Sequence, residues 1–284
     1  MDCRRVVFAG CGFLGEAAAG LFLESGWRVL GLCATRESAA RLASRPFAVD
    51  VADISRPLLA PGGWERPDVL VHCASSGRGG ADAYKAVYRD GMSHLLEAFA
   101  PKRIIFTGST SVYAQTDGAC VTEESPTEPD RETGRILLEA EALALRAGGV
   151  VARLAGIYGP GRSVLLRKFL EGSAVLEAGG YRWINQIHRD DAARALWHLA
   201  TSANAQGIFN VCDDTPSTQQ DVYGWIASFL QRPLPPKGPA DLDRKRGWTS
   251  KQVKNIKLRA IGWTPAYPSY RAAIPSLIAA AKAD

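Results

Sequence analysis

The sequence predicts an α/β fold, in which a doubly wound parallel sheet carries a small C-terminal lobe. Short apolar runs alternate with helical patterns as far as Gly156, a glycine-rich turn joins the first run to the first helix, and the alternation then breaks down. Strands that alternate with helices form parallel sheets. We therefore expect a dinucleotide-binding domain over residues 1–156 and a substrate-binding lobe over residues 157–284, interleaved with the same sheet.

Composition excludes several classes of protein. The 284 residues carry a formal net charge of +5, and basic residues cluster only from Arg244 to Arg259, a stretch we interpret as the solvated face of a C-terminal helix. No leader is visible, and no apolar stretch reaches the roughly 18 residues that a membrane span needs. The six cysteines are scattered without a C-x-x-C pair. We expect a cytoplasmic protein without a metal, a nucleic-acid partner or a membrane partner.

The first strand and helix are joined by a glycine motif. Residues 5–15 read RVVFAGCGFLG, which is an apolar run followed by G-x-G-x-x-G at Gly10, Gly12 and Gly15. In a dinucleotide site the first glycine permits the turn, the second admits the pyrophosphate and the third lets the helix approach the strand. The following helix directs unpaired N–H groups at the phosphates. The alternative is a tight turn without a ligand.

The end of the second strand, at residues 27–33, bears on the choice of cofactor. An NAD site usually has a carboxylate there to hold the ribose hydroxyls. This chain has Ala34, Thr35 and Arg36 instead, and its first acid is Glu37. A guanidinium fork matches a phosphate, so Thr35 and Arg36 favour NADP, while NAD stays possible. The alternative is that Arg36 is an ordinary surface residue.

Further elements follow in order along the main domain. We predict strands at residues 46–51, 68–74, 103–107 and 150–154, and helices at residues 82–99 and 133–146. His72 lies inside an apolar run and is interpreted as a core histidine. The apolar stripes of the two helices are wide, which predicts either internal core or the interface of a homodimer.

The second half is less regular. It contains a turn at residues 157–162 and patterns typical of helices and strands at residues 164–170, 183–187, 190–200, 207–211 and 218–230. Because the alternation of strands and helices breaks down here, this half reads as a smaller lobe built on the sheet and not as an independently folding domain.

Eight segments, taken in order, resemble the extended short-chain dehydrogenase/reductase superfamily, the NAD(P)-dependent epimerase/dehydratase group. They are GCGFLG at 10–15, DVAD at 50–53, DVLVHCA at 68–74, FTGSTSVYA at 106–114, RLAGIYGPGR at 153–162, IHRDD at 187–191, FNVCDD at 209–214 and KLRAIGWTP at 257–265. The resemblance implies a Rossmann-type fold and a catalytic serine at Ser109. It also implies cofactor contacts at Gly10, Gly12, Phe13, Leu14, Gly15, Asp50, Val51, Ala74 and Ser75.

The sequence departs from the family at its proton donor. Family members carry a Tyr-x-x-x-Lys pair at the start of the helix after the acidic loop, and here the two positions read Thr133 and Leu137. A tyrosine works as an acid near neutral pH because the lysine lowers its pKa, and threonine and leucine supply neither function. The chain therefore resembles an atypical branch of the family.

Two residues are candidates to replace the missing pair. Tyr113 follows Ser109 by four residues, and His188 has a side chain suited to acid–base work near neutral pH. The alternative for His188 is a structural hydrogen bond to the aspartates that follow it. We expect an NADP(H)-binding oxidoreductase that acts on a small carbonyl or hydroxyl substrate. A catalytically silent NADP-binding sensor and a nucleotide-sugar epimerase or dehydratase are the alternatives.

Overall fold

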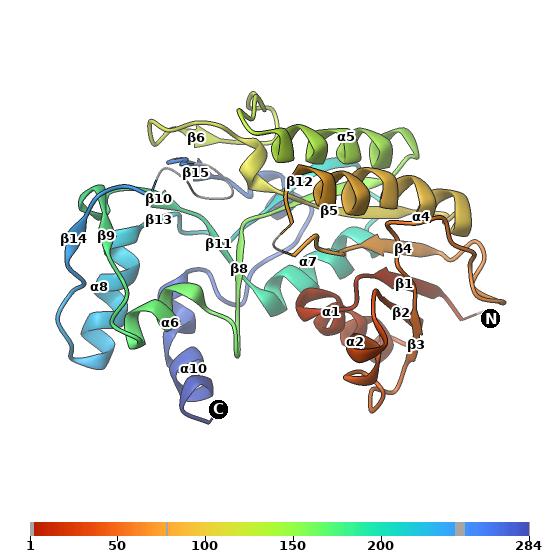
Figure 1. Ribbon diagram of the computed structural model, residues 1–284, viewed down its shortest axis with the longest axis horizontal. Helices are drawn as coiled ribbons and strands as arrows, with labels where there is room; N and C mark the ends of the chain where they lie inside the picture. Colours follow the sequence, from red (N-terminus) through yellow and green to blue (C-terminus); the bar gives the residue numbers. More distant parts are fainter. Residues whose placement is uncertain (1–2, 78, 242–247, 284) are drawn as a thin grey trace.

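The computed structural model describes residues 3–77, 79–241 and 248–283. At its centre is a seven-stranded sheet in the order β12-β7-β5-β4-β1-β2-β3, and every neighbouring pair is parallel (Figure 1). The strands are β1 (Arg5–Ala9), β2 (Arg28–Cys33), β3 (Ala48–Val51), β4 (Val69–His72), β5 (Ile104–Ser109), β7 (Val150–Leu154) and β12 (Gly207–Val211). The predicted doubly wound Rossmann-type sheet is confirmed.

Helices cover both faces of this sheet (Figure 1). On one face α1 (Phe13–Glu24) packs against α7 (Arg189–Thr201). On the other face α4 (Gly91–Phe99) packs against α5 (Glu132–Arg146). The central strands are therefore buried on both sides, and this accounts for their predominantly apolar sequences.

The helical segment before α4 is irregular. It begins as α3 (Ala81–Tyr84), widens into a π-helical turn at Lys85–Asp90, and continues directly as α4. His72 of β4 is fully buried beneath it, in agreement with its interpretation as a core histidine. Its Nε2 is 3.0 Å from the carbonyl oxygen of Val87, which lies in the π-helical turn.

The C-terminal lobe has a hydrophobic core of its own. Three helices build it: α6 (Val164–Leu170), α8 (Gln219–Leu230) and α10 (Tyr270–Ala283) (Figure 1). Short strands complete the lobe and its junction with the sheet: β8 (Gly156–Tyr158), β9 (Leu176–Glu177), β10 (Trp183–Ile184), β11 (Gln186–His188), β13 (Ser217–Thr218) and β14 (Lys237–Gly238). After β11 the chain returns to the main sheet as α7 and β12.

The basic stretch near the C-terminus differs from its interpretation as a helix face. Residues 244–247 lie outside the described part of the chain, and residues 248–255 are largely extended. Here β15 (Gln252–Val253) pairs with β6 (Cys120–Val121), and only α9 (Ile256–Ala260) is helical. Lys251 is buried, and its Nζ donates a hydrogen bond of 2.5 Å to the carbonyl oxygen of Tyr113. Backbone pairing with residues 115–121 therefore overrides the helical pattern.

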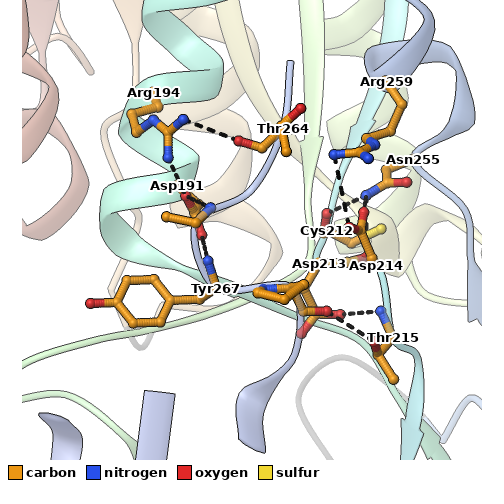
Figure 2. A network of polar contacts seen from close by, with 12 residues as sticks. Asp191, Arg194, Cys212, Asp213, Asp214, Thr215, Asn255, Arg259, Thr264 and Tyr267 are labelled. Atoms are coloured by element: carbon orange, nitrogen blue, oxygen red, sulfur yellow. Dashed lines mark hydrogen bonds and ion pairs between the residues drawn. The ribbon is translucent and has the colours of Figure 1, made fainter. Parts of the chain in front are cut away.

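Polar contacts fasten this C-terminal segment to the end of β12 (Figure 2). Asn255 Nδ2 donates to the carbonyl oxygen of Cys212 and to Oδ1 of Asp214, both at 2.9 Å. On the neighbouring helix α7, the buried carboxylate of Asp191 accepts a hydrogen bond of 2.8 Å from the backbone N–H of Tyr267.

Among the described residues, no helix combines the length and the apolar content needed to cross a membrane.

Candidate functional site

A cavity of about 610 Å³ opens at the carboxyl ends of β1 and β4. The strand order reverses between these two strands, and ligands of open α/β sheets bind at that position. Residues from the glycine turn, from the loop after β4 and from the end of β5 form its wall. Of the sequence-predicted site residues, those on the wall are Gly10, Gly12, Phe13, Leu14, Ala74, Ser75 and Ser109.

The three glycines of the turn differ in what a Cβ would meet at each position. Gly10 has φ +93°, and a Cβ there would collide with the backbone of Ala74. A Cβ on Gly15 would lie 2.6 Å from the carbonyl oxygen of Gly10. A Cβ on Gly12 would meet no atom within 4 Å, so this glycine faces open space on the cavity wall. This open position at the start of α1 fits the pyrophosphate of a dinucleotide.

Positive charge lies beside the glycine turn. Two guanidinium groups lie over the ring of Phe13, with the Cζ of Arg162 at 5.0 Å and that of Arg189 at 5.2 Å from its centroid. Arg189 forms an ion pair with Asp190 at 2.7 Å, whereas Arg162 lines the cavity. Arg162 is therefore placed to meet the charge of a bound phosphate.

The carboxyl end of β2 differs in detail from the sequence-based expectation. Thr35 caps the short helix α2 (Arg36–Ala40) by accepting a hydrogen bond from Ser38 N–H, and Arg36 is exposed outside the cavity lining. Ser38 and Arg41 line the cavity instead, with Arg41 Nη2 donating to Ser38 Oγ at 3.1 Å. Sequence reasoning missed both residues. The threonine cap was a signal for them, because it fixes which side of α2 faces the sheet.

A similar offset occurs at the end of β3. Asp50 and Val51 border a second hollow of about 360 Å³ and are absent from the lining of the main cavity, whereas Ala52 and Asp53 line both. Asp53 accepts a hydrogen bond of 2.7 Å from Ser55 Oγ, which holds the pKa of its carboxyl below the usual range. Asp53 is therefore a carboxylate at neutral pH.

The end of the cavity away from the glycine turn contains the predicted catalytic serine and one of the two positions of the missing Tyr-x-x-x-Lys pair. Ser109 ends β5, and its Oγ accepts a hydrogen bond of 3.2 Å from Ser111 N–H. Leu137 of α5 lines the same cavity. Thr133, one turn earlier on α5, lines a second cavity of about 390 Å³. Tyr84 borders both cavities.

Tyr113 lies outside the lining of both cavities. It is fully buried, donates through Oη to Asn210 Oδ1 at 2.8 Å and accepts from Arg153 Nη1 at 2.9 Å. Arg153 in turn forms a buried ion pair with Glu141 at 2.7 Å. Burial raises the pKa of the Tyr113 phenol. The surroundings of Tyr113 are those of a structural network in the core.

His188 is also buried, with 1% of its surface exposed, and lies outside the cavity lining. Its Nδ1 accepts a hydrogen bond of 3.3 Å from Asp190 N–H and so caps α7, and its ring centroid is 4.0 Å from that of Tyr267. Burial lowers the pKa of the His188 imidazole. These contacts match the structural alternative considered for His188.

Among the described residues, no cluster of three or more His, Cys, Asp or Glu side chains is arranged to hold a metal.

Comparison with known proteins identifies the family. The model of the NAD dependent epimerase/dehydratase family matches residues 6–212, which contain the glycine turn and the seven strands of the main sheet except the first residue of β1. The chain belongs to this family. A cofactor of the NAD type follows from the family and agrees with the cavity at the glycine turn.

Several relatives extend over nearly the whole length of this family member. Protein YeeZ of Escherichia coli (strain K12) is 29% identical over 259 residues, covering 86% of this chain and 90% of that protein. A 3-diazoavenalumate denitrifying reductase of Streptomyces sp is 29% identical over 300 residues, covering 94% and 98%. A solved structure from Methylobacillus flagellatus, provisionally described as a NAD-dependent epimerase/dehydratase, is 27% identical, with a TM-score of 0.80 and coverage of 99% and 100%.

Proposed function

We propose that the protein is an NADP(H)-dependent oxidoreductase that acts on a small carbonyl or hydroxyl compound. The observation that carries the proposal is the cavity wall, which has open space at Gly12 near one end and the Ser109 hydroxyl near the other. Bound NADPH would supply the hydride. The reductase name of the Streptomyces relative supports the redox class.

Different residues of this wall would bind the cofactor and the substrate. The N-terminus of α1 and Arg162 would bind the pyrophosphate through N–H dipoles and a full positive charge. Because Ser109 Oγ already accepts from Ser111 N–H, its hydroxyl proton is left to donate to a substrate oxygen. That hydrogen bond would strengthen as negative charge develops on the oxygen.

Selectivity for NADP is proposed to depend on Arg41 and Ser38 at the carboxyl end of β2. Replacing Arg41 by alanine removes a charged hydrogen bond to the 2′-phosphate, which is worth about 1.5–3 kcal/mol. NADPH should then bind roughly 10- to 150-fold more weakly, while NADH affinity stays nearly constant. Arg36→Ala is the matched control, because Arg36 is exposed outside the lining. Fluorescence titration with each cofactor measures both effects.

The same titration separates the proposal from its alternatives. Equal affinity of the unmodified protein for NADPH and NADH would refute NADP selectivity, and loss of NADPH binding in Arg36→Ala alone would reassign the phosphate contact. Tight NADPH binding without turnover across a screen of aldehydes, ketones and alcohols would favour the catalytically silent sensor.

A second reaction of the same redox class fits the apolar side chain of Leu137 on the cavity wall. An aryl diazonium carbon that gains hydride releases dinitrogen, and no substrate oxygen has to be protonated. The name of the Streptomyces relative points to chemistry of this kind. Incubation with NADPH and a simple benzenediazonium salt tests it, because dinitrogen must form in step with NADPH oxidation. NADPH oxidation no faster than in a protein-free mixture would exclude it.

A further inference from the structure

The starting point is the wall between the two cavities. Leu137 faces the large cavity and Thr133 the second one, on the same face of α5. Neither side chain donates a proton at neutral pH. Reduction of a carbonyl leaves an oxygen that must be protonated, so another group of the wall has to do this work.

Most ionisable groups on the wall of the large cavity are unsuited to this role. Cys11 and Cys73 belong to the glycine-turn end, where Cys73 Sγ donates to the carbonyl oxygen of Gly10 at 3.3 Å. Burial raises the pKa of the Cys11 thiol to about 12. Cys33 ends β2, and Asp53 is held as a carboxylate by Ser55. Arginines do not release protons at this pH.

Two tyrosines remain among the described residues of that wall, Tyr84 and Tyr88. Tyr88 faces the large cavity only, and its ring is stacked on that of His72 with an interplanar angle of 10°. Tyr84 is 5% exposed and borders both cavities, so it stands on the same wall as Thr133. It ends α3, which packs beside α5.

The backbone next to Tyr84 is built to hold these rings in place. The π-helical turn at Lys85–Asp90 follows Tyr84 directly, and π-turns occur frequently at functional sites. A carbonyl only accepts, so the contact to Val87 assigns the proton of His72 to Nε2. Burial lowers the pKa of His72 to about 4, so the ring stays neutral. The turn is therefore fixed to β4.

We propose that Tyr84 is a catalytic residue, the phenol that protonates the substrate oxygen in place of the missing tyrosine. The inference rests on the proposed reductase function. The carbonyl carbon gains a hydride from the reduced nicotinamide, which is thereby oxidised, and the electron pair of the C=O π bond moves to oxygen. That oxygen takes the Tyr84 proton, while Ser109 holds it by a hydrogen bond. The phenolate regains its proton from water.

A spectroscopic test of the position of Tyr84 does not depend on the substrate. The positive charge of NADP⁺ beside a phenol favours the phenolate, so one tyrosine should ionise at a pH lower by about one unit or more when NADP⁺ binds. Tyrosinate ultraviolet absorbance, followed across pH with and without NADP⁺, reports this change. Tyr84→Phe should abolish the shift. Tyr181→Phe should retain it, because Tyr181 is 68% exposed and outside both cavities.

Kinetics supply the second test. Tyr84→Phe should lower kcat for carbonyl reduction by about 10²- to 10⁴-fold and leave the NADPH dissociation constant unchanged. Adding Thr133→Tyr with Leu137→Lys to that variant should restore part of kcat, because the pair supplies an acid from α5.

The outcomes separate this proposal from the function on which it rests. Absence of NADPH and NADP⁺ binding would refute the proposed function. NADP⁺ binding without a tyrosinate shift, or a shift lost in Tyr88→Phe and retained in Tyr84→Phe, would overturn the role of Tyr84 alone. An unchanged kcat for carbonyl reduction in Tyr84→Phe would do the same, because another group would then protonate the substrate oxygen. If none of the carbonyl compounds tested is reduced, the tyrosinate shift on NADP⁺ binding still tests the position of Tyr84: its presence supports the proposal and its absence overturns it.

Discussion

Alanine at Gly12 should weaken cofactor binding at nearly unchanged stability, whereas alanine at Gly15 should lower the stability of the fold. The two glycines are three residues apart in the same turn, and each variant adds one methyl group. At Gly15 the methyl carbon would lie 2.6 Å from the carbonyl oxygen of Gly10 and 3.0 Å from Cys73 Sγ. Overpacking of this kind costs about 1–3 kcal/mol. The melting temperature should fall by roughly 2–4 °C for each kcal/mol.

The Gly12 methyl has no protein atom within 4 Å, and its φ of −101° is open to alanine. Stability should therefore be nearly unchanged. The methyl would occupy the space expected for the pyrophosphate and separate it from the N–H groups of α1. Loss of one charged hydrogen bond costs about 1.5–3 kcal/mol, so NADPH should bind roughly 10- to 150-fold more weakly.

Thermal unfolding without ligand and fluorescence titration with NADPH measure the two effects separately. Gly12→Ala protein that binds NADPH with unaltered affinity would refute the placement of the pyrophosphate. Gly15→Ala protein as stable as the parent would show that the turn relaxes at no cost, contrary to the packing argument.

Three further predictions concern stability and assembly. Arg153→Met leaves the Glu141 carboxylate buried without its partner and should lower the free energy of unfolding, measured in urea, by about 3–5 kcal/mol. The control Arg167→Met breaks an exposed ion pair with Glu171 and should lower it by about 1 kcal/mol or less. Because burial lowers the pKa of His72 to about 4, the unfolded chain binds more protons between about pH 4 and 6.5. Stability should fall as pH drops through that window, by at most about 1.4 kcal/mol per unit for this group, and His72→Asn should remove that slope. The helices at residues 81–99 and 132–146 are predicted to pair in a homodimer, and a monomeric mass in light scattering would contradict this.

Sequence patterns predicted the sheet well because each central strand is buried on both faces and therefore mostly apolar. The glycine turn was equally readable, since Gly10 and Gly15 each prevent a specific collision. The offset at the end of β2 had a single signal, the threonine before α2, because a helix of five residues is too short for its apolar spacing to show which side faces the sheet. There the phase of one short helix, set by the Thr35 cap, decides that Arg41 lines the cavity.

Residues of the interior were harder to assign, because their partners come from distant parts of the chain. Tyr113 was a candidate for catalysis from its distance to Ser109 in sequence, yet Asn210 and Arg153 surround its hydroxyl. Tyr84 belonged to a stripe with helical spacing that predicted core or interface. Its burial agrees with that stripe, but the two cavities that it borders depend on contacts between α3 and α5, which the spacing along one helix does not show.

The pairing of β6 with β15 sets an order of events during synthesis on the ribosome. The polypeptide reaches β6 after about 120 residues, but the partner strand is not made until residue 253. Until then the carbonyl oxygen of Tyr113 lacks Lys251, and Asn210 Nδ2 lacks the carbonyl oxygen of Lys254. Nascent protein shorter than this would expose that edge to chaperones and proteases, and a stop codon before position 250 should yield chains that are degraded rather than a smaller folded protein.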